Sequence, residues 1–370
     1  MRPTSAIVRL GDIANNYQLA CRVSPASQNI AVIKANAYGH GMVKVAQFLE
    51  DSVPVFAVAF IDEAIQLREA GISKPILILQ GASRVEDIAE SAARGFWLAV
   101  NHQQQLDWLL SAKLPGPIRV WLKVDTGMNR LGFAPEALDQ AYNDLCSIPG
   151  VLPGSVVFTH LACADELANP LTRRQVTMAR FFTEKHNLAL SIANSAGVLH
   201  WPESHAQWNR PGYMLYGLCP TGSPEACPHG LRPAMTMSSE IIAIRNLAPG
   251  EGVGYGHDWI AKRPSKIGAV AIGYGDGYPR HAPSGTPVLV NGQRVPLTGR
   301  VSMDAISVDL TDLETVDVGD PVELWGQNLC VNQVASIAGT IGYEILAGLT
   351  GRVPTTHVYS SLEQQENSSG

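Results

Sequence analysis

The chain has 370 residues, 46% of them hydrophobic, and a formal net charge of -6 at pH 7. This is enough apolar material for one large domain and a smaller one. The mild acidity and the lack of a basic run argue against nucleic acid or an anionic membrane surface as a partner. No segment stays apolar long enough to cross a bilayer, and the N-terminus lacks the apolar core of a signal peptide, so we expect a cytoplasmic protein.

The cysteines are the second feature that narrows the protein class. Six of them are scattered along the chain, and no two form a Cys-x-x-Cys pair. This argues against a disulfide framework and against a zinc site built from cysteines. We therefore expect reduced thiols and no bound metal.

The first part of the chain alternates short aliphatic runs with segments of helical periodicity. Residues 62–71 and 172–187, for example, have apolar residues at helical spacing and turn residues at their ends. The aliphatic runs are continuous, which is typical of strands covered on both faces. They occupy residues 29–35, 54–60, 75–80, 96–100, 117–125, 155–161, 188–194 and 207–217.

Eight such runs with helices between them predict an α/β fold that begins with a TIM-like (β/α)8 barrel over residues 1–230. The first few residues could instead join the second domain. A doubly wound open sheet is the alternative architecture.

After about residue 230 the pattern changes to strands punctuated by glycine, proline and Asn-Gly. Segments 237–247, 265–275, 286–299 and 305–313 are strand-like, and Asn291-Gly292 is typical of a hairpin turn. Residues 331–340 and the stretch after them have a helical pattern. We therefore predict a mainly β C-terminal domain over residues 231–360. The polar tail, residues 361–370, is expected to be disordered.

Five polar residues fall at or shortly after the ends of the predicted barrel strands, and a sixth, Arg210, falls near the last strand. In a (β/α)8 barrel, the C-terminal ends of the strands line the active site. Each residue alone has an ordinary explanation; Lys34 could rest its stem on the rim of a strand and keep its charge in water. Their joint placement predicts one site formed by Lys34, Arg130, His160, Asn194, Ser195 and Arg210.

The stretch IAVIKANAYGHG, residues 30–41, places Lys34 directly after an apolar run. A desolvated lysine has a lowered pKa and becomes nucleophilic toward an aldehyde. Tyr38, Ser195 and the backbone around Gly212 could hold a phosphate through neutral hydrogen bonds. Together these groups fit pyridoxal phosphate held as a Schiff base, although a Schiff-base aldolase without a cofactor would use the same residue types.

A set of longer motifs resembles the alanine racemase family. The motifs are AVIKANAYGHG (31–41), VDTGMNRLGF (124–133), HLACADE (160–166), ANSAG (193–197), RPGYMLYG (210–217), VGYG (253–256), AIGYGDGYPR (271–280), TGRVSMDAISVDLT (298–311) and GTIGYEIL (339–346). The resemblance extends from about residue 7 to residue 359. It implies a pyridoxal phosphate-dependent racemase with an N-terminal barrel and a C-terminal β domain. It also implies a head-to-tail homodimer in which each active site combines one subunit's barrel with the other subunit's β domain.

Four residues match the catalytic positions of that family. Lys34 matches the lysine that binds the cofactor covalently and acts as one base. Tyr255 matches the opposite base, contributed by the partner subunit, and His160 would orient this tyrosine. Arg210 matches the arginine that donates to the pyridine nitrogen. The resemblance therefore implies racemisation of alanine by two bases.

The other matches concern the cofactor and the substrate. The phosphate cradle is matched by Tyr38, Ser195, Gly212, Tyr213 and Tyr343, and the cofactor site also includes Asn194 and His160. Arg130 matches a residue that contacts the phenolic oxygen and the substrate carboxylate, and Lys123 matches a lysine carbamylated in many members. Substrate-end positions are matched by Met303 and Asp304 in a partner-subunit loop and by Tyr274 at the entry channel.

The residue types explain why such a site would racemise. One base on each face of the α-carbon can remove a proton from one side and return it on the other. A tyrosine is a poor base unless a neighbour lowers its pKa, and His160 with Arg130 is the candidate for that neighbour. Because Arg210 cannot accept a proton and is always charged, it disfavours a protonated ring nitrogen beside it, which should suppress side reactions such as transamination.

Other functions remain open at this point. A racemase of broader specificity would also act on serine, since one or two methylenes change discrimination by only about 1–3 kcal/mol. A barrel-type pyridoxal phosphate decarboxylase would need an acidic residue for the ring nitrogen and a catalytic cysteine near the C-terminus, and Cys330 lacks that context. A non-catalytic pyridoxal phosphate-binding protein would be a single barrel. Whether D-alanine would supply peptidoglycan or be catabolised is not encoded in these residues.

Overall fold

The computed structural model describes residues 2–221 and 230–360. The chain forms two compact units, which we describe in turn. One is Asn16–Leu215, the barrel unit; the other combines Met1–Asn15 with Tyr216–Gly370, the β unit. The predicted disordered tail lies outside the described residues.

The barrel unit contains a parallel sheet with the strand order β2-β10-β9-β8-β7-β6-β5-β4-β3. Its strands are β2 (Gln28–Asn29), β3 (Ala31–Val32), β4 (Phe56–Val58), β5 (Ile76–Ile78), β6 (Trp97–Val100), β7 (Arg119–Lys123), β8 (Val156–Phe158), β9 (Ala189–Ser191) and β10 (Trp208–Asn209).

The two ends of this order are parts of one strand that closes the barrel. The amide of Ile30, between β2 and β3, donates to the carbonyl of Asn209 in β10 (2.9 Å). The amide of the next residue, Ala31, donates to the carbonyl of Val55 just before β4 (3.1 Å). Successive amides therefore bond to opposite neighbours, as in a strand inside a closed sheet. The predicted (β/α)8 barrel is confirmed, and the open doubly wound sheet is wrong.

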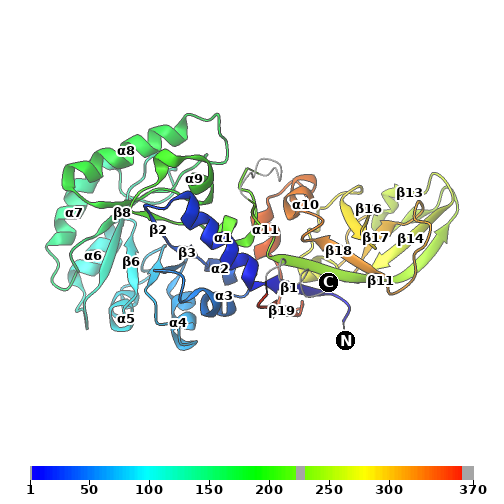
Figure 1. The fold of residues 1–370 in the computed structure, drawn as a ribbon, viewed down its shortest axis with the longest axis horizontal. Coiled ribbons are helices and arrows are strands. Elements are labelled where there is room, and N and C mark those ends of the chain that lie inside the picture. The colour runs from blue at the N-terminus through cyan, green and yellow to red at the C-terminus, as the bar shows by residue number, and fades with distance from the viewer. Residues whose placement is uncertain (1, 222–229, 361–370) are drawn as a thin grey trace. The chain divides into compact units, whose positions relative to one another are not determined.

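Helices cover the outside of the barrel strands (Figure 1). They are α3 (Met42–Leu49), α4 (Ile61–Glu69), α5 (Glu86–Arg94), α6 (Gln103–Ser111), α7 (Leu138–Cys146), α8 (Leu171–His186) and α9 (Ser195–His200), while α1 (Leu10–Val23) crosses the division between the two units. The predicted helical segments 62–71 and 172–187 form α4 and α8. In α8 the buried Val176, Ala179 and Phe182 recur at helical spacing, so one face packs inward and the charged face remains outside.

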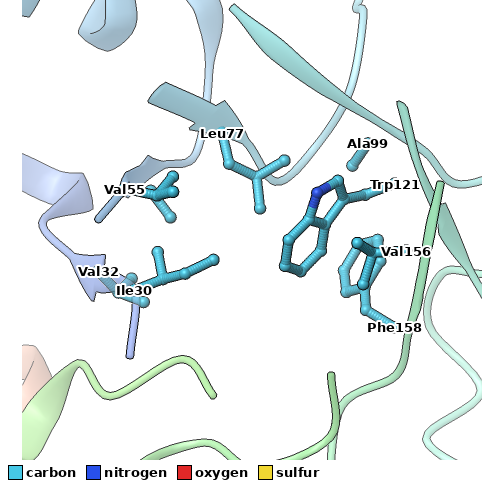
Figure 2. Close-up of a cluster of buried hydrophobic side chains, with 9 residues drawn as sticks. Ile30, Val32, Val55, Leu77, Ala99, Trp121, Val156 and Phe158 are labelled. Carbon is cyan, nitrogen blue, oxygen red and sulfur yellow. The ribbon is translucent and has the colours of Figure 1, made fainter. Parts of the chain in front are cut away.

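The barrel interior is filled by large side chains rather than left as a pore. Figure 2 shows side chains from successive strands pointing toward a common centre, with Trp121 beside Phe158. The ring of Trp208 lies 5.8 Å from that of Trp121 and 5.9 Å from that of Trp97. These side chains fill the barrel interior with a rigid apolar core. The polar groups at the C-terminal ends of the strands are supported by this core.

The β unit contains a sheet ordered β14-β17-β16-β15-β18-β11-β1-β19. Its strands are β1 (Ser5–Arg9), β11 (Met235–Leu247), β14 (Ser265–Val270), β15 (Pro287–Val290), β16 (Gln293–Thr298), β17 (Ile306–Asp309), β18 (Pro321–Trp325) and β19 (Thr355–Val358). The long strand β11 pairs with β18 in its first half and with β14 in its second, and a bulge between Ile241 and Ala243 lies at the change of partner. This second pairing closes the sheet on itself.

Smaller elements complete the β unit. β12 (Gly252–Val253) and β13 (Trp259–Ile260) form a separate two-stranded sheet, and the predicted helical region forms α10 (Val331–Ala338) and α11 (Gly342–Ala347). The predicted hairpin is confirmed, because Val290 of β15 pairs with Gln293 of β16. Asn291 and Gly292 between them have φ of 50° and 75°, the left-handed pair that a two-residue turn requires.

The division between the units differs from the boundary drawn at residue 230. Tyr216 already belongs to the β unit, because its carbonyl accepts the amide of Ala234 (3.1 Å). The carbonyl of Cys219 accepts a hydrogen bond from Asn332 of α10 (3.0 Å). Residues just after the last barrel strand are thus held by elements far ahead in the sequence, which a local pattern does not register.

Two expectations about the class of protein can be compared with the structure. Cys219 is disulfide-bonded, contrary to the expected reduced thiols. Cys21, Cys146, Cys163 and Cys330 are free. Among residues 2–221 and 230–360, every helix is too short or too polar to span a bilayer.

Candidate active site

Lys34 lies two residues after the end of β3, and the chain then forms a left-handed turn. The four residues from Ala35 to Tyr38 all have φ between 52° and 54°, and Gly39 follows at 81°. A left-handed residue with a Cβ costs about 1–2 kcal/mol, so a run of four without glycine is strained backbone. The strained turn, residues 35–38, separates the side chains of Lys34 and Tyr38 and fixes how each leaves the end of the barrel.

Five basic side chains of the barrel unit lie close enough to perturb one another's charge. Lys123 ends β7, His160 follows β8 and Arg210 follows β10. Their electrostatic neighbours include Lys34 after β3 and Arg130 in the loop after β7. We call Lys34, Lys123, Arg130, His160 and Arg210 the basic cluster. It brings together four of the six polar residues predicted to share a site, together with Lys123.

Burial and repulsion from neighbouring cations lower the pKa values of Lys34, Lys123 and His160. For Lys123, burial followed by the neighbouring cations lowers the pKa from 10.5 to about 8. Burial and then Arg130 lower the pKa of Lys34, opposed by the carboxylate of Glu63. Burial first, and the surrounding cations after it, hold the pKa of His160 well below its ordinary value. Its imidazole is therefore neutral at neutral pH.

Arg210 is the fixed cation of the cluster. It is 5% exposed, and its guanidinium donates to the Ser191 hydroxyl, to the Thr159 carbonyl and to the Ile192 carbonyl (3.3 Å). Its Cζ also lies 5.4 Å from the centre of the Phe158 ring. Burial lowers the pKa of Arg210 to about 10, so the side chain remains charged at neutral pH. Several contacts from two strands thus fix its orientation.

A second part of the site surrounds Gly212. The Ser195 hydroxyl oxygen accepts the backbone amides of Gly212 (3.0 Å) and Met214 (3.2 Å). A Cβ at Gly212 would lie only 2.8 Å from the Tyr38 hydroxyl, so a larger residue there would push that hydroxyl away. Because the Ser195 oxygen accepts these amides, the hydrogen of its hydroxyl can be donated to a phosphate. We call Tyr38, Ser195 and the Gly212 backbone the hydroxyl cradle.

Asn194 and Tyr213 flank the hydroxyl cradle. The Asn194 side-chain oxygen accepts the amide of Gly197 (2.9 Å) and caps α9, which begins at Ser195. Tyr213 follows Gly212 and is 2% exposed. The cap fixes the start of α9 and with it the position of Ser195 in the hydroxyl cradle. Asn194 therefore affects the site through Ser195.

Gln175 supports the site and was missed by sequence reasoning. This fully buried side chain of α8 donates to the carbonyl of His160 (2.9 Å) and to the hydroxyl of Thr126 (3.2 Å), and it accepts the amide of Ala162 (2.9 Å). It therefore joins the loops that follow β7 and β8. The available signal was its position on α8, four residues before Ala179, on the apolar face of the helix.

Three predicted substrate-end residues lie on neighbouring loops of the β unit. The amide that follows Tyr274 donates to the carbonyl of Met303 (2.9 Å). Asp304 pairs with Arg352 (2.5 Å), which also reaches the buried carboxylate of Asp276 (3.5 Å). Met303 is 51% exposed. The β unit therefore presents these side chains on its own surface, linked through backbone and ion-pair contacts.

Tyr255 is the most exposed of the predicted aromatic residues. It lies between Gly254 and Gly256, whose φ values are 68° and 75°. It is also the first residue of a one-turn 3-10 helix, Tyr255–His257. Its exposed fraction is 67%, which is high for a large aromatic side chain. Tyr343, the remaining predicted residue of this unit, is half-buried in α11.

Comparison with known proteins gives the same classification as the motifs. The family model described as "Alanine racemase, N-terminal domain" matches residues 8–220, and the one described as "Alanine racemase, C-terminal domain" matches residues 234–357. The chain belongs to the alanine racemase family. It is an enzyme of the isomerase class, and the barrel followed by a mainly β domain is the fold of its family relatives.

Individual relatives of the alanine racemase family match over nearly the whole chain. A biosynthetic alanine racemase of Pseudomonas aeruginosa is 48% identical over 96% of this chain and 99% of its own length. An alanine racemase of Chromohalobacter salexigens is 47% identical, over 95% of this chain and 97% of its own.

Solved structures agree with these sequence relatives. The crystal structure of the biosynthetic alanine racemase from Pseudomonas aeruginosa superposes with a TM-score of 0.93 at 47% identity, covering 97% of this chain and all of that one. An alanine racemase from Bartonella henselae, solved with covalently bound pyridoxal phosphate, has a TM-score of 0.86 at 28% identity over 97% of this chain and 100% of that one.

Proposed function

We propose that this protein interconverts L-alanine and D-alanine with pyridoxal phosphate as its cofactor. The observation that carries the proposal is the joint presence of Lys34, the basic cluster and the hydroxyl cradle at one end of the barrel. An amine with a lowered pKa suits an aldehyde, and the cradle suits the phosphate of the same small molecule. The Bartonella relative with covalently bound pyridoxal phosphate supports this choice.

The charges of the barrel unit fit an anionic cofactor. The carboxylates that raise pKa values in the basic cluster are Glu63, which acts on Lys34, and Asp125, which acts on Lys123. They are fewer than the cations of the cluster, Lys34, Lys123, Arg130 and Arg210. The cluster therefore holds an excess of positive charge. A phosphate ester would compensate it, and its phosphate oxygens would accept hydrogen bonds at the cradle.

Lys34 and Tyr255 are the proposed bases. When bound, pyridoxal phosphate supplies the electron sink that makes the α-proton of an amino acid removable. Lys34 would hold the cofactor covalently and move a proton at Nζ on one face, because its lowered pKa makes the neutral amine accessible. Tyr255 of the partner subunit would move a proton at its hydroxyl on the other face. The exposed position of Tyr255 supports a role outside its own unit and hence a head-to-tail homodimer.

Three basic residues are proposed to tune this proton transfer. Neutral His160 would orient the partner's Tyr255 by a hydrogen bond rather than by charge. Arg210, anchored and always charged, would donate to the pyridine nitrogen and keep that nitrogen unprotonated, which favours simple proton return. Arg130 would contact the phenolic oxygen and the substrate carboxylate. A decarboxylase would need an acidic partner in the place that Arg210 occupies.

Other residues keep the roles that the resemblance implies. Lys123 would carry a carbamate, since a lysine with a pKa of about 8 has enough neutral amine to react with carbon dioxide. The resulting negative charge would relieve the basic cluster. Tyr213 and Tyr343 would add to the phosphate site. Tyr274, Met303 and Asp304 of the partner subunit would restrict the size of the substrate that the site accepts.

Racemisation assays test the proposed function directly. The purified protein is assayed with a panel of L-amino acids, with pyridoxal phosphate added and then removed, and borohydride reduction identifies the modified amine. We expect cofactor-dependent turnover of alanine, label on Lys34, and loss of both in Lys34→Ala but not in Lys44→Ala, an exposed lysine of α3. Label on another amine, or turnover without cofactor, would refute the proposal. Turnover of serine at a similar rate would replace it with a racemase of broader specificity.

Three wider predictions accompany this function. Turnover by a monomer would contradict the shared active site, which sedimentation with activity measurement can check. Cell fractionation tests the predicted cytoplasmic location. A D-alanine requirement in cells lacking the gene would support a role in peptidoglycan supply, whereas failure to grow on D-alanine would support catabolism.

A further inference from the structure

The strained turn, residues 35–38, needs external support because its backbone conformation is unfavourable. Its far end is tied within the same segment: the Asn36 carbonyl accepts the amide of Gly41 (3.0 Å), and the Asn36 side chain accepts the amide of Met42 (2.9 Å). Inside the turn, the amide of Gly39 donates to the carbonyl of Ala35 (3.1 Å). At the near end, the amide of Ile33 donates to the carbonyl of Ala57 in β4 (2.9 Å), and the Ile33 carbonyl accepts the amide of Ala37 (2.8 Å). The amide of Ala35, which begins the turn, is instead held by a side chain.

Glu63 holds the amide of Ala35 and adds a side-chain link to the backbone contact between Ile33 and β4. One carboxylate oxygen accepts the amide of Ala35 (2.6 Å), the first residue of the strained turn. The other accepts the amides of Ala59 (2.7 Å) and Phe60 (3.3 Å), where the chain leaves β4 and enters α4. The single side chain therefore spans the ends of two adjacent barrel strands, with backbone donors on both sides. Its charge also lies near Lys34.

We propose that Glu63 is a positioning residue, which locks the start of the strained turn to the end of β4 and so holds Lys34 and Tyr38 at the cofactor site. The inference rests on the proposed role of Lys34 and extends it to a residue that touches neither substrate nor cofactor. A hydrogen bond to a charged carboxylate is among the stronger ones in proteins. Loss of the hydrogen bonds made by one of the two Glu63 carboxylate oxygens should let the turn leave its left-handed conformation.

The informative variant is Glu63→Gln. Glutamine has the same length, but only one of its two terminal atoms can accept, so its amide nitrogen would face a backbone N–H on one side. Glu63→Asp keeps the charge and shortens the reach by one methylene. The matched control is Asp62→Asn, which removes the neighbouring exposed carboxylate from the same first turn of α4.

Hydrogen exchange of the cofactor-free protein is the first measurement. In Glu63→Gln we expect the amides of residues 31–42 to exchange about tenfold faster than in wild type, because a hydrogen bond to a charged carboxylate is replaced by a weaker one. Glu63→Asp should behave similarly, and Asp62→Asn should exchange like wild type. Faster exchange confined to residues 56–68 would mean that Glu63 only caps α4, which would overturn the proposal. So would full restoration by Glu63→Asp, since charge alone would then suffice.

Cofactor binding is the second measurement. Titration of the cofactor-free protein with pyridoxal phosphate, followed by absorbance, should give a Kd about tenfold higher in Glu63→Gln than in Asp62→Asn. An unchanged Kd together with unchanged exchange would refute the positioning role. If wild type binds no pyridoxal phosphate, the proposed function fails; the exchange result then still decides whether Glu63 holds the turn.

Discussion

Replacing Lys123 by methionine tests the electrostatic strain of the basic cluster. Lys123 is 7% exposed, and its ammonium lies 5.6 Å from the centre of the Phe158 ring among other cations. Its pKa falls from 10.5 to about 8, a difference that corresponds to about 3 kcal/mol. At pH 7, the folded cofactor-free protein is destabilised by about that amount because it holds Lys123 charged.

The pH dependence has a definite sign. Between pH 8 and 10.5, Lys123 is neutral in the folded protein and charged in the unfolded chain, so the unfolded chain binds more protons. The free energy of unfolding therefore gains a contribution that rises with pH across this window and is complete above it. Methionine cannot titrate, so Lys123→Met should lack this rise and should be more stable than wild type by up to about 3 kcal/mol at pH 7.

Urea unfolding of cofactor-free protein at pH 7 and pH 10 is the assay, in buffer depleted of carbon dioxide. Lys44→Met, in the exposed face of α3, is the control and should change stability by no more than about 0.5 kcal/mol. With pyridoxal phosphate bound, the advantage of Lys123→Met should shrink, because an anion already compensates the cluster. A Lys123→Met protein less stable than wild type at pH 7, with the same pH profile, would refute the electrostatic reasoning.

Three further substitutions probe the proposed site. Gly212→Ala would place a Cβ 2.8 Å from the Tyr38 hydroxyl. Overpacking of about 1–3 kcal/mol should raise the Kd for pyridoxal phosphate at least about tenfold. Unchanged binding in a titration would contradict the proposed role of the hydroxyl cradle in phosphate binding. Tyr255→Phe should slow deuterium exchange at the α-carbon more for L-alanine than for D-alanine, whereas equal slowing would argue against its assignment to one face. Arg210→Glu should lower racemisation and raise transamination; pyruvate formation measured beside racemisation checks this, and a constant product ratio would count against the role of Arg210.

Several parts of the fold were readable from local sequence. Continuous aliphatic runs marked the barrel strands because a strand covered on both faces has no polar side, and Asn291-Gly292 marked its hairpin because few residues accept positive φ. β18 and the pairing of β1 with β11 and β19 were not recognised. Their partners lie far away in the chain, and their own residues do not distinguish an edge or a closing strand from a loop.

The residues of the candidate site also include some that the sequence could identify and others that it could not. Lys34 and His160 could be named because each ends an apolar run, and Arg210 because it falls near the last strand; the barrel brings these positions together. Glu63 and Gln175 could not, since a single acidic or amide residue on an amphipathic helix resembles its exposed neighbours. Their importance comes from the backbone amides and carbonyls of other loops, which become neighbours only after folding.

The sequence by itself determined the alternation of strands and helices in the barrel, the change to a mainly β unit, the hairpin turn and the family. These depend on side-chain periodicity and on residues at fixed spacing. Only the tertiary structure decided that residues 35–38 turn left-handed without a glycine and that the barrel closes through the strand around Ile30. It also decided that burial, and neighbouring cations after it, lower the pKa of Lys123. The physical reason is that local preference opposes or ignores each of these features, whereas hydrogen bonds and charges from distant segments make them stable together.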